Sequence, residues 1–561
     1  FMTVLYIRWR FDIYTQEQNF AYQKNCETLF TFKLHSAVRK KIENPAFKET
    51  YKHLRTAFVI GKEDLSYDVN KALIHLQEAN EQEMGGKCRT RHSAKAMLDV
   101  MGDMEFDDFK TNFRFSKKPF GLLCDGSSDA ADITIFACYV QYIDHGVVKV
   151  NMYRMMELQE SESGENLVAL FMKNLLVDDL WEHFKEYLVS VTTDGASNMQ
   201  GIYSGFCRLL GETVGKQLIC HHCLAHRLQL ILRAVNHKAG VPAKCQNCVT
   251  LESVNNMLAA FYKQSPKRKT NLHIYCDANN FKIFNPKHTF PVRWVQSHYE
   301  ANECIFLHFK PLVLHLLKMS DDPEFSQDET TLERAPQFKD YLTHKNVLLT
   351  LAIMLDIQNA FKGLSKEFQL KGSSIIGQAQ KKKILVESMN LLKNNEGMFL
   401  KTLLMEAKCE GKSCKNLETF EASTNVEWED IKLHEDMFQL KSDFYIFHPL
   451  SEYKDAFLDA INVEIENYMP NDELMQVADA IDQSQWPSNI LEVLQDQVLM
   501  NNVKKWPAVA KHNSYQEETF LQDFRILIQC LSNDDGGFWC DNHTSKAHYF
   551  WAAILLSPCA P

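Results

Sequence analysis

The spacing of apolar positions changes near residue 118. Upstream of it, over residues 24–110, apolar residues recur at helical spacing with charged residues between them. The best-patterned segments are Lys48–Ile60, Asn70–Gln82 and Ser93–Met104. The sequence therefore predicts an N-terminal helical region over 1–115.

Short apolar runs follow, separated by turn residues or by segments with helical spacing. The predicted strands are Phe120–Cys124, Ile133–Tyr142, Val147–Leu158, Leu188–Thr193 and Gln217–Cys220. Three predicted helices, Gly164–Leu176, Asn198–Leu210 and Leu224–Val235, lie after the third, fourth and fifth strands. Three antiparallel strands that lead into two parallel ones through crossover helices predict a mixed, helix-covered sheet over 116–299.

From about residue 300 the strand pattern disappears. The predicted amphipathic helices are Phe306–Met319, Val347–Phe361, Lys383–Asn394, Met398–Ala407 and Tyr453–Met469. The sequence therefore predicts an all-α domain over 300–519. Apolar content returns in Phe520–Leu531 and His548–Leu556, and we expect 520–561 to rejoin the sheet domain. The predicted fold class is α/β plus all-α.

Composition narrows the class of protein. The chain is 45% hydrophobic and 24% charged, which excludes a disordered or collagen-like chain. No run reaches the roughly 18 apolar residues of a membrane helix, so we expect no membrane association. Its 16 cysteines are too sparse for a disulfide scaffold and favour a reducing compartment. The first residue is not Met, and we expect the chain to be incomplete.

Charge is distributed unevenly along the chain. The net charge of −11 argues against a uniformly basic nucleic-acid-binding protein. Residues 211–300, however, carry 12 basic and 4 acidic residues. This block is either a solvated basic face or a phosphate-binding surface. The candidate DNA contacts within it are Lys263, Lys267, Arg268 and Lys269.

Two aspartates stand where predicted strands end. Asp125 follows Phe120–Cys124, and Asp194 follows Leu188–Thr193. Strand carboxyl ends converge on one edge of an α/β sheet, and two adjacent carboxylates repel unless a cation lies between them. Such oxygen ligands suit Mg²⁺ or Mn²⁺, and a pair of these ions can hold the attacking and leaving oxygens of a phosphodiester. Alternatively, Asp-Gly after a strand is a simple turn.

Four ordered motifs extend this pattern. They are Leu123-Cys-Asp-Gly-Ser-Ser-Asp129, Thr192-Thr-Asp-Gly-Ala-Ser-Asn-Met199, Cys223-Leu-Ala-His-Arg-Leu-Gln-Leu230 and Pro291-Val-Arg-Trp294. With the strand order, they resemble the RNase H-like core of hAT-superfamily transposases, which a large helical insertion interrupts. The closest likeness is to domesticated vertebrate-type members, such as hAT-derived zinc-finger proteins and a group labelled E3 SUMO-protein ligase. No ligase chemistry can be located in the sequence, so that activity rests on resemblance alone.

The resemblance implies roles for matching positions. Asp125 and Asp194 would be the first two acids of a catalytic metal-binding triad. Cys223 and His226 match a Cys-x-x-His motif close to the active site and bound DNA, and Arg293 and Trp294 match an Arg-Trp motif where the insertion begins. Trp294 would either contact DNA or anchor a core.

Two differences between this chain and the family pattern bear on catalytic activity. The family's third acid follows an apolar stretch that Phe550–Pro558 resembles, and no acid follows Asp541 in this chain. The third acid is therefore expected beyond Pro561 or lost, together with the dimerisation helix that follows it. No zinc finger of the family's DNA-targeting type precedes residue 24.

A cysteine cluster allows a second metal interpretation. Cys220 with Cys223, and Cys245 with Cys248, form two C-x-x-C pairs at nearly zinc-ribbon spacing, and His221, His222 and His226 add possible ligands. Buried thiols are the alternative, because a helix between the pairs would separate them.

The sequence leaves two functional hypotheses. We expect a domesticated, transposase-like nuclear protein that binds DNA or protein and does not transfer strands. The alternative is an active DNA transposase that uses two Mg²⁺ or Mn²⁺ ions. The expected partners are DNA and a second copy bound through a C-terminal region, with no small-molecule cofactor.

Overall fold

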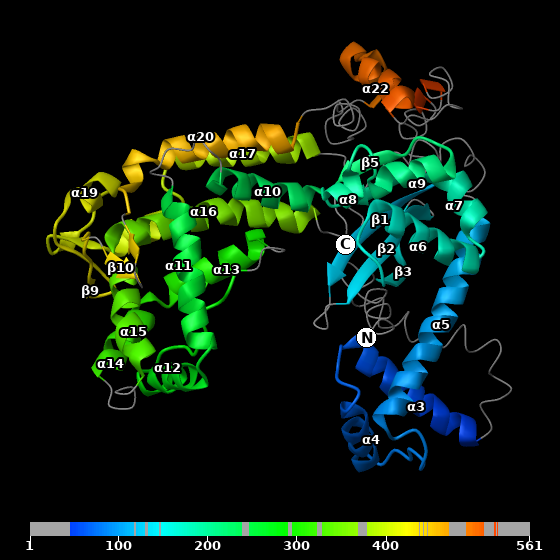
Figure 1. Ribbon diagram of the computed structural model, residues 1–561, viewed down its shortest axis with the longest axis horizontal. Coiled ribbons are helices and arrows are strands. Elements are labelled where there is room, and N and C mark those ends of the chain that lie inside the picture. Colours follow the sequence, from blue (N-terminus) through cyan, green and yellow to red (C-terminus); the bar gives the residue numbers. More distant parts are fainter. Residues whose placement is uncertain are drawn as a thin grey trace. The chain divides into compact units, whose positions relative to one another are not determined.

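Figure 1 shows the computed structural model of the chain, which divides into two compact units. Unit 1 comprises Phe1–Cys223, Lys371–Ile375 and Gln483–Pro561, and unit 2 comprises Leu224–Leu370 and Ile376–Asp482. The structure describes residues 45–116, 119–128, 133–144, 147–237, 246–289, 294–321, 328–368, 378–436, 438–440, 443–445, 447–470, 490–509, 521–522 and 524–525. The expected return of 520–561 to the sheet lies almost wholly outside these residues.

Unit 1 contains a mixed five-stranded sheet of order β3-β2-β1-β4-β5. The strands are β1 (Phe120–Ser128), β2 (Thr134–Asp144), β3 (Val147–Leu158), β4 (Leu188–Thr193) and β5 (Ile219–His222). The first three pair antiparallel, whereas β4 runs parallel to β1 and β5 runs parallel to β4. The predicted mixed sheet is confirmed, although β5 lies two residues later than predicted. The predicted end of the first strand at Cys124 is wrong: β1 continues to Ser128 in its pairing with β2, so Asp125 lies within the strand and does not follow it.

Side chains of β1 alternate between two apolar clusters. Leu122 and Cys124 belong to the large core cluster, whereas Leu123 packs with Tyr139 and Met152 on the other face. Because side chains along a strand alternate, Asp125 shares the face of Leu123. The sheet therefore presents Asp125 beside a small apolar cluster.

The other elements of unit 1, within its described residues, are helices. They are α3 (Pro45–Lys62), α4 (Val69–Ala79), α5 (Arg91–Ser116), α6 (Gly164–Val177), α7 (Trp181–Tyr187), α8 (Ser197–Gln200) and α9 (Phe206–Val214), with the later η6 (Ile490–Gln495) and α22 (Gln497–Val509). Through Phe109 and Phe113, α5 joins the core of the sheet. The N-terminal helical prediction is thus confirmed for residues 45–115, while α7 was not predicted.

The predicted helix Asn198–Leu210 is two helices. Residues 201–205 form a loop between α8 and α9, in which Gly205 N donates to Gly201 O at 3.0 Å. A Cβ on Gly205 would lie 2.4 Å from Gly201 N, so the closeness of the two backbones requires glycine. Continuous helical spacing of apolar residues concealed this interruption.

Unit 2 is mainly helical. Its helices are α10 (Leu224–His237), α11 (Gln246–Lys263), α12 (Pro266–Ala278), α13 (Trp294–Leu307), α14 (Phe309–Asp321), α15 (Glu329–Leu342), α16 (Lys345–Phe368), α17 (Gln378–Asn394), α18 (Met398–Glu406), α19 (Leu417–Ala422), η4 (Leu450–Glu452) and α20 (Lys454–Tyr468). Among the described residues, α16 alone is long and apolar enough to cross a membrane, and 72% of its apolar window is buried. It packs against α11, α13, α17 and α18 as the central helix of the unit.

Two predictions about this region need correction. The predicted all-α domain contains short strands, β6 (Lys408–Cys409), β7 (Lys412–Ser413), β8 (Val426–Trp428), β9 (Ile431–Lys432), β10 (Phe438–Leu440) and β11 (Asp443–Tyr445). These strands are too short to show an alternating pattern. The units also divide after Cys223 rather than after residue 299, because α10 packs against α20 and α11 against α16.

Candidate functional site

Both predicted aspartates lie at the same edge of the unit 1 sheet. β1 and β4 are adjacent and parallel, with Leu123 opposite Thr192 in the register. Asp125 and Asp194 each lie two residues after this register pair, so the two aspartates lie opposite each other on neighbouring segments of the chain. This arrangement follows from the parallel register of β1 and β4. β4 ends at Thr193, directly before Asp194, whereas β1 continues past Asp125 to Ser128 in its pairing with β2.

The electrostatics of Asp125 indicate that the two carboxylates are close. Burial, and then the negative charge of Asp194, raise the pKa of Asp125 to about 6, while a hydrogen bond from the Gly126 backbone opposes the shift. Burial and the charge of Asp125 in turn raise the pKa of Tyr139 to about 12. A carboxylate beside an apolar cluster and a second carboxylate is costly to ionise unless a cation is present.

Asp194 lies in a close-packed turn against β5. Its Oδ1 accepts a hydrogen bond from Ala196 N at 3.4 Å. A Cβ on Gly195 would lie 2.2 Å from Cε1 of His222, so the imidazole ring packs directly on this turn. The ring of His222 thus lies beside the residue that follows Asp194, a position that the sequence indicated only as a possible zinc ligand.

Gln200 ties the ends of β4 and β5 together. Its side-chain amide donates to Thr193 Oγ1 and to His221 O, both at 2.9 Å. In addition, Cys223 N donates to Thr193 O at 2.8 Å, which continues the parallel pairing one residue past β5. This clamp fixes the backbone on which Asp194 sits. Sequence reasoning missed this residue, because a glutamine in a short helix can have many roles.

The Cys-x-x-His motif is divided between the two units. Cys223 ends the β5 segment of unit 1 and is 6% exposed, whereas His226 belongs to α10 of unit 2. Cys223 therefore lies close to Asp194 through the backbone, but its thiol is packed away from solvent. A direct contact between that thiol and DNA would require the site to open.

The zinc interpretation gains no support from the described residues. Within them, no three His, Cys, Asp or Glu side chains gather in a way that could hold a metal ion. Cys220 lies next to Cys207, whose pKa is raised by their mutual hydrogen bond and by burial. Cys245 lies outside the described residues, and the side chain of Cys248 is not described. The zinc quartet therefore remains a prediction.

The strand-end pair fits a single divalent cation better than two. Asp125 and Asp194 supply two oxygen-rich groups whose mutual repulsion a cation would relieve. A two-ion site needs a further acid, and the described part of the chain places no third carboxylate, histidine or thiol with these two. The segment Phe550–Pro558, on which the expected third acid depends, lies outside the described residues.

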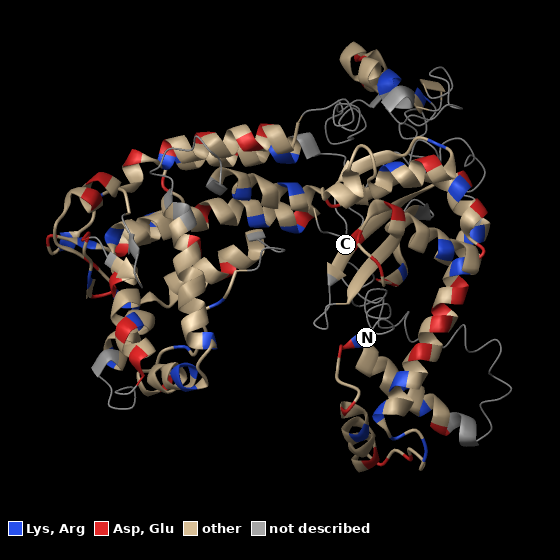
Figure 2. Cartoon of the chain, viewed as in Figure 1, with Lys and Arg blue, Asp and Glu red and all other residues tan. Residues whose placement is uncertain are grey.

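The four candidate DNA contacts of the basic block separate into two kinds. Lys263, at the end of α11, and Lys267 and Lys269, on α12, are exposed. Basic residues, coloured blue in Figure 2, occur where α11 ends and α12 begins. These three lysines can reach a phosphate backbone.

Arg268 does not belong with them, and its assignment as a DNA contact is wrong. It is 8% exposed, its Nε donates to Thr331 Oγ1 at 2.8 Å, and its guanidinium pairs with Asp328 at 3.2 Å. The guanidinium also lies 4.3 Å from the centroid of the Phe261 ring. Its charge is therefore already neutralised inside the core of unit 2.

The Arg-Trp motif remains untested. Arg293 lies outside the described residues, and Trp294 begins α13 with a side chain that is not described. No protein-family model matches the chain. The candidate site therefore rests on the sheet geometry and on the charges at its edge.

Proposed function

We propose that this chain is a DNA-binding regulatory protein derived from an hAT-type transposase, acting in the nucleus and without strand transfer. The observation that carries the proposal is the pair Asp125 and Asp194 on adjacent parallel strands, where the charge of one raises the pKa of the other. Three antiparallel strands followed by two parallel ones are also the order on which the likeness to an RNase H-like core depends.

Binding to DNA is supported by exposed positive charge. Lys263, Lys267 and Lys269 lie within one short stretch of two helices, in a chain whose net charge is −11. Lysine contacts with phosphates release counterions, so binding that uses them weakens steeply with salt. The positive charge of these lysines would outweigh the acidity of the rest of the chain only in their neighbourhood. DNA would therefore bind in one orientation, with its phosphates toward this surface.

We propose that strand transfer is absent because two acidic residues are too few to hold two metal ions. One cation between Asp125 and Asp194 can orient a phosphate and partly neutralise it, but a two-ion mechanism must also stabilise the leaving oxygen. No residue of the described ranges supplies the additional ligand. The retained pair would then hold one Mg²⁺ or Mn²⁺ as an aid to DNA binding.

The DNA-binding half of the proposal is tested by salt dependence. We expect the Lys263→Ala, Lys267→Ala, Lys269→Ala triple variant to flatten the log–log slope of affinity against salt by about 2.7, at about 0.9 for each lost phosphate contact. A matched control replaces Lys401, Lys412 and Lys415, exposed lysines of α18 and the β6–α19 region, and should keep the slope. Equal slopes in both variants would mean that Lys263, Lys267 and Lys269 do not contact the phosphates of DNA.

The catalytic half is tested by a nicking assay on hairpin and linear DNA with Mg²⁺ or Mn²⁺. We expect no cleavage by the chain. The active-transposase alternative predicts cleavage that the Asp194→Asn variant abolishes. That result would show that a further ligand completes the strand-end pair, and it would replace the regulatory proposal.

A further inference from the structure

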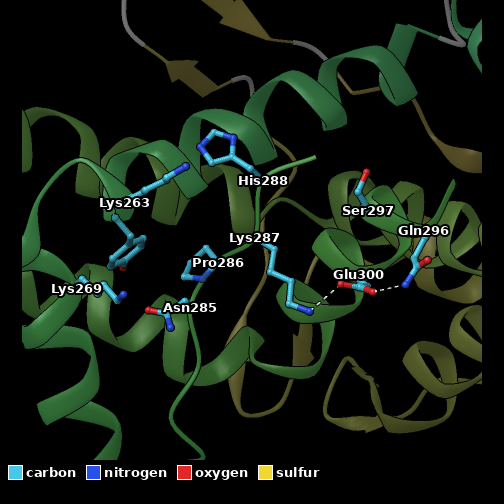
Figure 3. A pocket seen from close by; sticks show the side chains of 10 residues that line it. Lys263, Lys269, Asn285, Pro286, Lys287, His288, Gln296, Ser297 and Glu300 are labelled. Carbon is cyan, nitrogen blue, oxygen red and sulfur yellow. Dashed lines mark hydrogen bonds and ion pairs between the residues drawn. The ribbon is translucent and has the colours of Figure 1, made fainter. Parts of the chain in front are cut away.

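A cavity of about 500 Å³ lies in unit 2. It is formed between the end of α11, the start of α12, the segment 285–288 and the first turns of α13 (Figure 3). Its size is within the range of pockets that hold small organic ligands, which is roughly 300–1,000 Å³. A cavity of this size accepts a nucleotide-sized molecule.

Positive charge dominates the lining. Lys263, Lys269 and Lys287 line the cavity with a single acid, Glu300, so the fixed charge is three positive and one negative, a net +2. Among the described residues, no carboxylate forms an ion pair with Lys263 or Lys269. Burial, and then the positive charge of Lys263, lower the pKa of His288, which keeps that ring neutral at pH 7. Two ammonium groups thus face the cavity without an anion.

The opposite wall is fixed by a hydrogen-bonded set. Lys287 Nζ pairs with Glu300 Oε2 at 3.0 Å, and Gln296 Nε2 donates to Glu300 Oε1 at 3.0 Å, as the dashed lines of Figure 3 show. Gln296 keeps its amide oxygen as an acceptor. On the side of Lys269, Asn285 accepts a hydrogen bond from His273 Nε2 at its amide oxygen, at 2.9 Å, and keeps its NH₂ group as a donor (Figure 3). The cavity therefore offers a donor beside Lys269 and an acceptor beside Glu300.

The backbone of the cavity is anchored to the core of unit 2. Thr289 N donates to Asn256 Oδ1 at 2.9 Å, and Phe284 is 7% exposed with its ring 4.3 Å from that of His308. On the other side, Tyr262 shares a 2.9 Å hydrogen bond with His315. A site whose walls are held in place loses little conformational freedom on binding, which favours affinity.

We propose that this cavity binds a nucleotide through its terminal phosphate. Lys263 and Lys269 would contact the phosphate, Asn285, which lies beside Lys269, would donate a further hydrogen bond to it, and Gln296 on the other side would accept a hydrogen bond from the base (Figure 3). A phosphomonoester carries a charge of about −1.5 to −2 at pH 7, which matches the net +2, whereas an internal phosphodiester carries only one negative charge. Amide side chains supply the donor–acceptor pairs that read base edges.

Two sources present this chemistry: a free nucleoside 5′-monophosphate, and the 5′-phosphorylated end of a DNA strand. Calorimetric titration of the full chain separates them. The probes are deoxyadenosine 5′-monophosphate against deoxyadenosine, and one trinucleotide with a 5′-phosphate against the same trinucleotide with a 5′-hydroxyl. We expect each phosphorylated probe to bind at least about tenfold tighter than its unphosphorylated partner. The tighter of the two phosphorylated probes identifies the source.

Substitutions locate the binding. The Lys263→Gln, Lys269→Gln double variant should lose the preference for phosphorylated probes, while Glu300→Gln, which raises the net charge to +3, should strengthen binding several-fold. Lys412→Gln removes an exposed lysine of β7 that does not line the cavity, and it should leave probe binding unchanged. An unchanged thermal midpoint in every variant shows that folding is intact.

Two results would overturn the proposal. One is equal binding of phosphorylated and unphosphorylated probes. The other is a phosphate preference that survives in the double variant, which would place the phosphate elsewhere. Neither result bears on the proposed function, which is tested separately. A flatter salt dependence of duplex binding in a Lys267→Gln variant, by about 0.9 in log–log slope, concerns the exposed surface, because Lys267 does not line the cavity.

Discussion

The sheet edge of unit 1 and the lysine cavity of unit 2 carry opposite excesses of charge. At the sheet edge, Asp125 and Asp194 lie at the same level of neighbouring strands, and the charge of one opposes ionisation of the other. In the cavity, Lys263 and Lys269 have no ion-pair partner among the described residues. Each region is therefore incomplete in a way that a ligand of opposite charge would correct, a cation in the first and a phosphate in the second.

The comparison also shows that sequence clusters of charge are not uniform. Lys267, Arg268 and Lys269 are consecutive on α12, yet two are exposed and the third is a core residue paired with Asp328. A helix turns about 100° per residue, so three neighbours face different directions. Charge along the chain therefore locates a surface only after the helix faces are known.

The largest expected effect is on the buried member of this trio. We predict that Arg268→Met lowers the free energy of unfolding by about 3 kcal/mol, because it leaves the carboxylate of Asp328 without its buried partner. Lys267→Met and Lys269→Met should each change it by no more than about 0.5 kcal/mol. Urea denaturation followed by tryptophan fluorescence measures all three. A small effect of Arg268→Met would return that residue to the candidate DNA surface.

The next largest effect is the pH dependence of stability that Asp125 causes at the sheet edge. The pKa of Asp125 is about 6 in the folded chain and about 3.9 in the unfolded chain, so the folded state holds the proton more tightly. The contribution of Asp125 to the free energy of unfolding is fully present below pH 4 and is lost as the pH rises through 6. Because Asp125 is partly exposed and solvent screens its charge, we expect this loss in the free energy of unfolding to be about 2 kcal/mol. We predict that Asp125→Asn stabilises the chain by about this amount at pH 7.5 and has little effect at pH 4.

Thermal denaturation at the two pH values checks this prediction. Asp194→Asn is the matched variant, because it removes only the smaller, electrostatic part of the pKa shift and should stabilise less. Equal stability of the wild type and Asp125→Asn at both pH values would mean that the carboxyl group is well solvated.

A third effect tests the cation. With Mn²⁺ at ten times its dissociation constant, binding to the folded state should add about 1.4 kcal/mol to the free energy of unfolding. We expect this gain in the wild type and its loss in both Asp125→Asn and Asp194→Asn. The same titration with the Lys263→Gln, Lys269→Gln variant is the control from the other unit and should show the full gain. A gain that persists without the aspartates would place the ion elsewhere.

The smallest effect concerns the clamp beneath the sheet edge. We predict that Gln200→Ala lowers the free energy of unfolding by about 1 kcal/mol, because Thr193 Oγ1 and His221 O each lose a hydrogen bond. Asn198→Ala, which removes one exposed bond to Glu162 O, should cost less than half as much. If the clamp positions Asp194, Gln200→Ala should also weaken Mn²⁺ binding, whereas Asn198→Ala should not.

Much of the fold was predictable because its elements are strongly patterned. Leu188–Thr193 was predicted with the bounds it has in the structure, since its β-branched and apolar residues favour a strand and the Asp-Gly turn after Thr193 ends it. The mixed sheet followed from the order of strands and crossover helices. The break at 201–205 was missed because helical spacing of apolar residues continues across it.

The site was predictable only where backbone pairing places the residues. Asp125 and Asp194 are brought together by the parallel pairing of β1 and β4, which the strand order predicted, although Asp125 lies within β1 and not at its end. The cavity, in contrast, joins Lys263 to residues of 285–300 through the packing of α11, α12 and α13, and no spacing along the chain reveals it. The burial of Arg268 likewise depends on Asp328, 60 residues away. Such contacts between distant segments leave no periodic signal.

The pairing of α10 with α20 has a consequence for synthesis of the chain. All five strands of the unit 1 sheet come from 120–222, so the sheet can form as soon as this stretch leaves the ribosome. α10 follows at once, but Arg227 meets its partner Tyr468 across 241 residues. During that interval the apolar side of α10 has no α20 to cover it. We expect nascent chains halted before α20 to recruit chaperones, and release to follow when that helix emerges.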